Sequence, residues 1–409
     1  MTGLGVFAAV LLVFTLLSKR LGGTAVSPAM VFALSGLLLG VAGGADIRPS
    51  ELEGDAREAV LLLAELALAL VLFADAAKLG LRRLRSDSQL PDRLLGIGLP
   101  LTIAAGVLAA LVLFGQLDIW EMVLLAALLA PTDAALAAPV VSDRRVPARV
   151  RDALDVEAGL NDGGVVPVVF FALAATVAVE GSPEHGLAHE ALVIIGGGVV
   201  VGAVAGALGG RVMAAAIRRR TVAPAYEQMA LAALAVVTFF AADAIGASGF
   251  IAAFVAGLLA AAPLGDRRER LTEFMEQDGQ ILSFAVFFIF GVLAASVLDD
   301  LTWTIAGYAV LSLTIIRTVP VVLAMVGSGL KPPTLAFMGW FGPRGIASIA
   351  LLFVVISEEH GLPGLATIET TVVATVLLSI VVHGVSAPSL VARYSRYVEA
   401  LTKEAPELG

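Results

Sequence analysis

The amino-acid sequence predicts an all-α protein that crosses a membrane many times. Hydrophobic residues make up 59% of the 409 residues, charged residues only 15%, and the mean hydropathy is +0.95. A typical soluble domain carries about 25% charged residues. The apolar residues also gather into runs of about 20, the length that a helix needs to cross a bilayer core of about 30 Å. These observations predict a polytopic membrane protein, and none of them indicates a nucleic-acid partner.

Thirteen apolar runs follow one another along the chain, and we expect them to form about 13 transmembrane helices. They lie near residues 3–18, 26–44, 57–78, 93–115, 119–141, 149–179, 190–213, 224–245, 248–263, 275–297, 302–326, 333–357 and 366–391. The loops between them are short, and the tail after the last run is too short for a further domain. We therefore expect a single transmembrane unit over residues 1–409, without a soluble regulatory domain.

The basic residues predict the orientation of these helices. With the N-terminus outside, cytoplasmic loops hold all but four of the 26 Lys and Arg residues. Arg48 and Arg57 lie in outside loops that are otherwise acidic, and Arg317 and Arg344 lie inside apolar runs. Cytoplasmic loops of membrane proteins are enriched in Lys and Arg. We therefore expect an outside N-terminus, a cytoplasmic C-terminus and a multi-pass protein of the cell (inner) membrane.

Two of the runs are interrupted by helix-breaking residues. The fifth run contains Pro131, and the twelfth contains the sequence GPRG at 342–345. Proline removes a backbone donor, and glycine permits unwinding. The breaks lie seven runs apart, and this odd offset predicts two inverted six-helix repeats with discontinuous helices 5 and 12. Paired interrupted helices are typical of transporters with a site at the midplane. Simple proline kinks would not explain the charged residues beside each break.

Charged residues lie beside both breaks at membrane depth. A charge near the bilayer centre costs on the order of 3 kcal/mol and therefore usually faces a pathway or a partner. Asp133 follows the first break, at the start of the second half-helix, where exposed N–H groups favour a negative charge. Arg317 and Arg344 are the expected counter-charges of buried carboxylates. An intramembrane arginine can also simply hold helices together, and for Arg317 this alternative remains open.

The sixth run carries the residues with the clearest chemistry. Asp162 lies about 20 Å along a helix from Arg149 and therefore near the midplane. Glu157 and Asp162 are about 140° apart around the helix, so we expect them to have different roles. A desolvated carboxylate at this depth can hold a proton or a cation. With neutral Asn161 beside it, one proton would exchange for one monovalent cation. The oxygen ligands would be Asp162, Asn161 or Thr132, and carbonyls near the first break.

The segments EAGLNDGG, APTD, RTVP and GPRGIAS resemble the NhaP-type sodium/proton antiporters of the monovalent cation:proton antiporter-1 family, which includes the animal sodium/proton exchangers. The similarity extends over nearly the whole chain in the number and order of runs. It implies a homodimer in the lipid membrane, with dimerisation helices near 1–80 and 224–297. It also implies a six-helix core near 93–180 and 302–391 that moves as an elevator.

The resemblance also implies roles for single residues. It implies Asp162 as the cation and proton carrier, Asn161 as its neighbour, Thr132 and Asp133 at the helix crossing, and Glu157 ion-paired with Arg344.

Two positions depart from the family pattern. Ala158 stands where members commonly have serine, which removes a hydroxyl ligand from the face of Asp162. The third run reads LVLFADAAKL, with Asp75 one place after the position where members often have glutamate. Asp75 is either an auxiliary site residue or a helix-end aspartate paired with Lys78. The cation preference therefore stays open.

These observations predict an electroneutral monovalent cation/proton antiporter, and sodium/proton exchange is the first interpretation. Potassium/proton exchange, or exchange of potassium, sodium and lithium alike, is the alternative. A cation channel does not require inverted broken helices. An intramembrane hydrolase is disfavoured because the HExxH and GxSxG motifs are absent and neither Asp133 nor Asp162 follows a glycine, as a catalytic membrane aspartate would. We expect no enzyme activity and no cofactor besides the transported Na⁺ or K⁺ and H⁺.

The remaining features receive no role in this scheme. The four histidines, His185, His189, His360 and His383, have no metal-binding spacing, and an external pH-sensing role for them has little support. Glu65 and Asp243 lie in apolar runs, where we expect helix contacts. The glycine-rich stretch 196–210 is expected to allow close helix packing, and it does not indicate nucleotide binding.

Overall fold

Helices account for most of the described chain. The computed structural model describes residues 2–21, 24–43, 48–83, 89–180, 189, 191–265, 267–357, 362–401 and 405–407. No strand occurs within these ranges. Within them, nine helices are long and apolar enough to cross a membrane, and four shorter helices are apolar. The helices follow the predicted runs in order. The number of spans, their orientation and the inverted repeats remain predictions.

The chain divides into two compact units. The first contains residues 1–60, 88–161 and 284–409, and the second contains residues 61–87 and 162–283. Three helices pass from one unit to the other: α3 (Gly54–Arg83), α8 (Ala148–Glu180) and α13 (Arg267–Val297). The predicted division into dimerisation and core helices remains a prediction.

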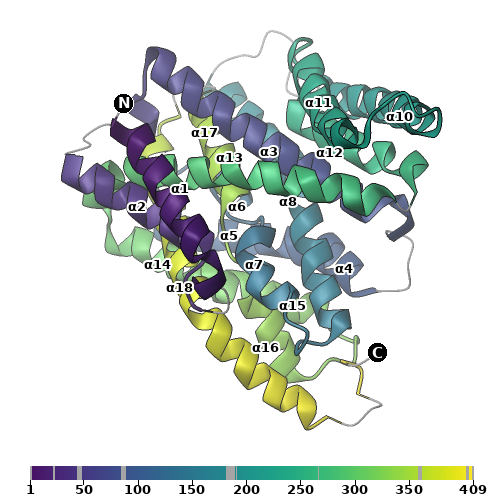
Figure 1. The fold of residues 1–409 in the computed structure, drawn as a ribbon. Coiled ribbons are helices and arrows are strands. Elements are labelled where there is room, and N and C mark those ends of the chain that lie inside the picture. Colours follow the sequence, from purple (N-terminus) through teal and green to yellow (C-terminus); the bar gives the residue numbers. More distant parts are fainter. Residues whose placement is uncertain are drawn as a thin grey trace. The chain divides into compact units, whose positions relative to one another are not determined.

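The first unit contains both predicted helix breaks (Figure 1). Besides its parts of α3, α8 and α13, its helices are α1 (Thr2–Leu21), α2 (Pro28–Gly43), η1 (Pro49–Glu51), α4 (Gln89–Arg93), η2 (Leu94–Gly98), α5 (Leu99–Leu113), α6 (Ile119–Leu128), α7 (Ala134–Val141), η5 (Leu298–Asp300), α14 (Trp303–Leu313), α15 (Ile315–Ala324), α16 (Pro332–Trp340), α17 (Ile346–Ser357) and α18 (Leu365–Glu399). Helix α18 packs against α2, α6, α7, α14, α16 and α17. Every residue of α17 except its last is buried. A helix that is apolar on all sides is stable in such an interior position.

The second unit contains three helices that pack closely together, α10 (Gly197–Arg218), α11 (Pro224–Asp243) and α12 (Gly249–Ala260), as Figure 1 shows in teal and green. It also contains η3 (Leu192–Gly196) and η4 (Ala262–Leu264). Glycines recur at every fourth position of α10 and face α12. A Cβ on Gly202 would overlap the carbonyl oxygen of Ala252, and a Cβ on Gly206 would overlap that of Ala256. The glycine-rich stretch therefore allows close helix packing, as predicted.

Both predicted interruptions are present. Residues 129–133 separate α6 from α7, and residues 341–345 separate α16 from α17. A further interruption at Thr314, with φ −115° and ψ −89°, divides the predicted single helix 302–326 into α14 and α15. Here the Thr314 N–H bonds to the carbonyl of Leu311 instead of continuing the α-helical ladder. Pro320 then lacks the N–H that would bond to Ile316 four residues earlier, which weakens the next turn.

Candidate functional site

Asp133 holds the starts of two half-helices. Its Oδ1 accepts a hydrogen bond from the Leu136 N–H in α7 (2.8 Å), and its Oδ2 accepts one from the Ile346 N–H at the start of α17 (2.7 Å). Its own N–H donates to the carbonyl of Pro343 (2.8 Å). Helix N-termini carry partial positive charge, so two of them stabilise this buried carboxylate. Asp133 therefore joins the two interrupted helices.

The glycines of the second break make room for the charged side chains. A Cβ on Gly345 would overlap Asp133 Oδ2, and a Cβ on Gly342 would overlap the guanidinium of Arg317. Both glycines are therefore required by close approach as well as by the unwound backbone.

Arg344 places a positive charge at the first break, next to the C-terminal end of α6. Its Nη1 donates to the carbonyl oxygens of Ala130 (3.0 Å) and Pro131 (3.1 Å), just past the C-terminal end of α6. The side chain is fully buried, and its Nε and Nη2 have no hydrogen-bond partner among the described residues. A cation is favoured beside the carbonyls at a helix C-terminus. Ser348 adds a bond from its Oγ to the carbonyl of Leu128 (2.6 Å).

Glu157 forms a buried ion pair with Arg317. Arg317 Nη2 donates to Glu157 Oε2 at 2.7 Å, and Nη1 donates to Oε1. The predicted pair of Glu157 with Arg344 is therefore wrong. Arg344 is instead held by the carbonyls of the first break, where its charge faces a helix end. The fork of Arg317 matches both carboxylate oxygens, which is the strongest geometry for such a pair. Arg317 also links α15 to α8.

Asn161 and Thr132 connect α8 to the first break. Asn161 Nδ2 donates to Thr132 Oγ1 at 2.6 Å, and both side chains are buried. Asn161 Oδ1 has no hydrogen-bond partner within the described ranges. Asp162 is the next residue of α8, is 4% exposed, and begins the part of this helix that belongs to the second unit. A shared role of Asp162 and Thr132 in holding a cation remains a prediction.

A stripe of polar residues on α18 was not predicted. Ser379 Oγ accepts a hydrogen bond from the Arg344 N–H (2.6 Å), and His383 Nε2 lies 2.9 Å from the carbonyl oxygen of Trp340. Ser386 Oγ accepts a bond from Trp340 Nε1 (3.0 Å). The spacing of four and then three residues places all three side chains on one helix face. In the sequence, this stripe is indicated only by polar residues that recur at helical spacing inside an apolar run.

Both ring nitrogens of His383 lie near carbonyl oxygens, which can only accept a hydrogen bond. Nε2 lies 2.9 Å from the carbonyl oxygen of Trp340, and Nδ1 lies 3.0 Å from the carbonyl oxygen of Ser379 and 3.2 Å from its Oγ. Ser379 Oγ also accepts from the Arg344 N–H. His383 and Ser379 thus link the end of α16 to the residues before α17. Two backbone groups at the second break, the N–H of Arg344 and the carbonyl of Trp340, are therefore contacted by α18.

Asp75, Glu65 and Asp243 are less buried than the charged residues at the two breaks. Asp75 is partly exposed on α3, which continues to Arg83, so it lies within the helix and not at its end, and its pairing with Lys78 remains a prediction. An auxiliary role for Asp75 remains a prediction. Glu65 is partly exposed on α3, and Asp243 is the exposed last residue of α11.

The histidines divide into three groups. His185 and His360 lie outside the described residues, His189 is exposed, and His383 is buried.

The chain matches a family and several known proteins. The family model for the transmembrane sodium/hydrogen exchanger matches residues 7–393. The K(+)/H(+) antiporter NhaP2 of Shewanella sp. (strain MR-4) is 23% identical over 387 residues, which cover 93% of this chain and 64% of that protein. The uncharacterized Na(+)/H(+) exchanger YjcE of Escherichia coli (strain K12) is 31% identical over 134 residues, 33% of this chain and 24% of that protein. The chain thus spans less than two thirds of the length of these curated relatives.

A solved structure has the same fold. The structure of the sodium proton antiporter MjNhaP1 from Methanocaldococcus jannaschii at pH 8 matches with a TM-score of 0.75 and 20% sequence identity. The match covers 97% of this chain and 99% of that chain.

Proposed function

Because the chain belongs to the transmembrane sodium/hydrogen exchanger family, we propose that it exchanges one monovalent cation for one proton, with sodium as the first candidate. The family consists of cation/proton antiporters, which are transporters and not enzymes. Potassium is the second candidate. It is favoured by the similarity to a K(+)/H(+) antiporter over 93% of the chain and by Ala158, which offers no hydroxyl ligand.

The hydrogen bonds of Asp133 and Glu157, the other two buried carboxylates near the breaks, carry this proposal. Asp133 accepts N–H bonds from two helix starts, and both oxygens of Glu157 accept from Arg317. All four carboxylate oxygens are thus engaged by donors of the protein itself, so both groups suit structural roles. We therefore assign the exchange of ions to Asp162.

The proposed cycle uses competition at one carboxylate. A buried carboxylate is stabilised either by a proton or by a bound cation, and one negative charge balances only one of them. Asn161 is neutral and directs its Nδ2 to Thr132, which leaves Oδ1 as an oxygen ligand next to Asp162 in the sequence. The carbonyls of Ala130 and Pro131 face Arg344, so we assign the neutral ligand to Asn161.

Alternating access would move the two breaks together. Asp133 and Arg344 each bond across the crossing, and the N–H of Asp133 bonds directly to the carbonyl of Pro343. Elements joined by so many buried bonds suit rigid-body motion rather than separate movement. An elevator movement of a homodimer in the cell (inner) membrane agrees with this arrangement.

Transport in proteoliposomes tests the proposal. Purified protein is reconstituted with a pH-sensitive dye inside, a pH gradient is imposed, and sodium, potassium or lithium is added in turn. The unchanged protein is expected to move protons when a transported cation is added. Asp162→Asn is expected to abolish this movement, whereas Asp243→Asn, at an exposed helix end, is expected to retain it. Cation-dependent proton movement by Asp162→Asn would contradict the assignment.

A further inference from the structure

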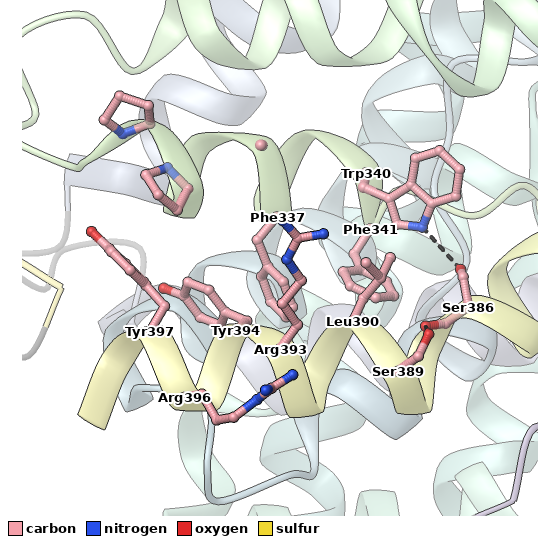
Figure 2. Close-up of a pocket in the computed structure, with 13 residues that line it drawn as sticks. Phe337, Trp340, Phe341, Ser386, Ser389, Leu390, Arg393, Tyr394, Arg396 and Tyr397 are labelled. Carbon is pink, nitrogen blue, oxygen red and sulfur yellow. Dashed lines mark hydrogen bonds between the residues drawn. The ribbon is translucent and has the colours of Figure 1, made fainter. Parts of the chain in front are cut away.

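A groove of about 1330 Å³ lies between α16 and the C-terminal half of α18 (Figure 2). Phe337 and Trp340 line it from α16, and Leu390, Arg393 and Arg396 line it from α18. No acidic residue is among the described residues that line it. The groove is therefore apolar in most of its wall and positively charged at one end.

The expected depth of this groove in the membrane follows from the positions of its lining residues along α16 and α18. The break after Trp340 is the predicted midplane site, and α16 runs back from it to Pro332, about 12 Å along the axis. On α18, Ser386 bonds to Trp340, and Arg393 and Arg396 follow about 10 and 15 Å further along that axis. Half the thickness of a bilayer core is about 15 Å. The apolar end therefore lies at acyl-chain depth, and the arginines lie at the predicted cytoplasmic surface.

The two arginines are available to an external anion. Arg393 makes no ion pair or hydrogen bond with the part of the chain that the structure describes, and in Figure 2 it extends from α18 toward Phe337. Arg396 is exposed, and its Nε bonds only to the carbonyl of Ala392 on its own helix (3.3 Å). Arginine binds phosphate through two parallel N–H bonds. Their position suits a negatively charged group at the membrane surface.

We propose that this groove binds one anionic glycerophospholipid of the cytoplasmic leaflet. Arg393 and Arg396 bind the headgroup phosphate, and an acyl chain lies along Phe337 and Leu390 toward Trp340. Anionic lipids are enriched in that leaflet and attract basic residues near the surface, and aromatic residues favour the same depth. The site depends on the membrane orientation of the chain and is independent of the proposed exchange activity.

Quenching of Trp340 fluorescence tests the site. The chain has three tryptophans, so Trp120→Phe with Trp303→Phe leaves Trp340 as the only reporter. This variant is placed in nanodiscs that contain increasing fractions of phosphatidylglycerol or phosphatidylcholine with brominated acyl chains. We expect half-maximal quenching at an at least fivefold lower fraction of phosphatidylglycerol, because each basic residue near anionic lipid contributes on the order of fivefold.

Variants separate the site from general contact with lipid. In the same background, Arg393→Gln with Arg396→Gln is expected to remove the preference for phosphatidylglycerol. Arg218→Gln with Arg219→Gln, two exposed arginines at the end of α10, is expected to retain it. Inorganic phosphate at millimolar concentration is expected to leave quenching unchanged. Equal quenching by the two lipids, a preference that survives loss of both groove arginines, or displacement by phosphate alone would each overturn the proposal.

Discussion

The Asp133 carboxylate accepts a hydrogen bond from the backbone N–H of Ile346, a residue 213 positions further along the chain. The same carboxylate also accepts from Leu136 at the start of α7. One side chain therefore caps two half-helices and neutralises the positive ends of both. This bond places α17 directly against the first break, and Gly345 is the residue that makes room for it.

Gly345→Ala is expected to destabilise the protein. The added Cβ would overlap Asp133 Oδ2 and displace it from two N–H groups, and leaving such buried groups unpaired costs about 1–3 kcal/mol each. Thermal unfolding of the purified protein in detergent measures the effect. Gly307→Ala on α14 is the matched control, since a Cβ there has no atom within 4 Å. Equal melting temperatures for the two variants would contradict the crossing described here.

The helix breaks and Asp133 could be predicted because their causes are local. Pro131 removes a donor, the GPRG sequence permits unwinding, and a carboxylate at a helix start is favoured by the nearest N–H groups. The break at Thr314 could not be predicted, because no glycine or proline lies at that position.

The pairing of charges could not be predicted because it depends on packing. Arg317 and Arg344 both lie in apolar runs, and nothing in their sequence separation from Glu157 distinguishes them. The structure distinguishes them because Arg344 is turned to the carbonyls of Ala130 and Pro131. The contacts of the α18 stripe depend on packing too, since serine in a membrane helix often bonds only to its own backbone.

A double-mutant cycle is expected to show strong coupling between Glu157 and Arg317. Removing one member leaves the other charge buried and unpaired, which costs about 3–5 kcal/mol, whereas removing both costs less than the sum. The stabilities of Glu157→Leu, Arg317→Leu and the double variant give the coupling. The same cycle with Arg344→Leu in place of Arg317→Leu is the comparison. A larger coupling for Arg344 would show that the pair is assigned wrongly.

Ser379→Ala is expected to lower stability by about 1–3 kcal/mol, because the buried N–H of Arg344 would lose its acceptor. Ser395→Ala is the control on the same helix. Ser395 is also buried, but its Oγ bonds only to the carbonyl of Ala392 within α18. Melting temperatures in detergent compare the two variants. If Ser395→Ala lowered the melting temperature as much as Ser379→Ala, the link between α18 and the second break would lose its support.

Exchange of one monovalent cation for one proton is expected to move no net charge. On a solid-supported membrane, addition of the transported cation should therefore produce no sustained current in samples whose internal dye reports proton movement. The reason is that a single carboxylate holds one positive charge in each direction. A sustained cation-dependent current that disappears in Asp162→Asn would show a different stoichiometry.

Proton release on cation binding tests the central role of Asp162 most directly. Purified protein in weakly buffered detergent solution, held near the pH at which Asp162 is partly protonated, receives sodium or potassium chloride while the pH is followed. Choline chloride controls for ionic strength. The account predicts release of up to one proton per chain on addition of the transported cation, and none from Asp162→Asn. Equal release from both proteins, or none from the unchanged protein at any pH, would contradict it.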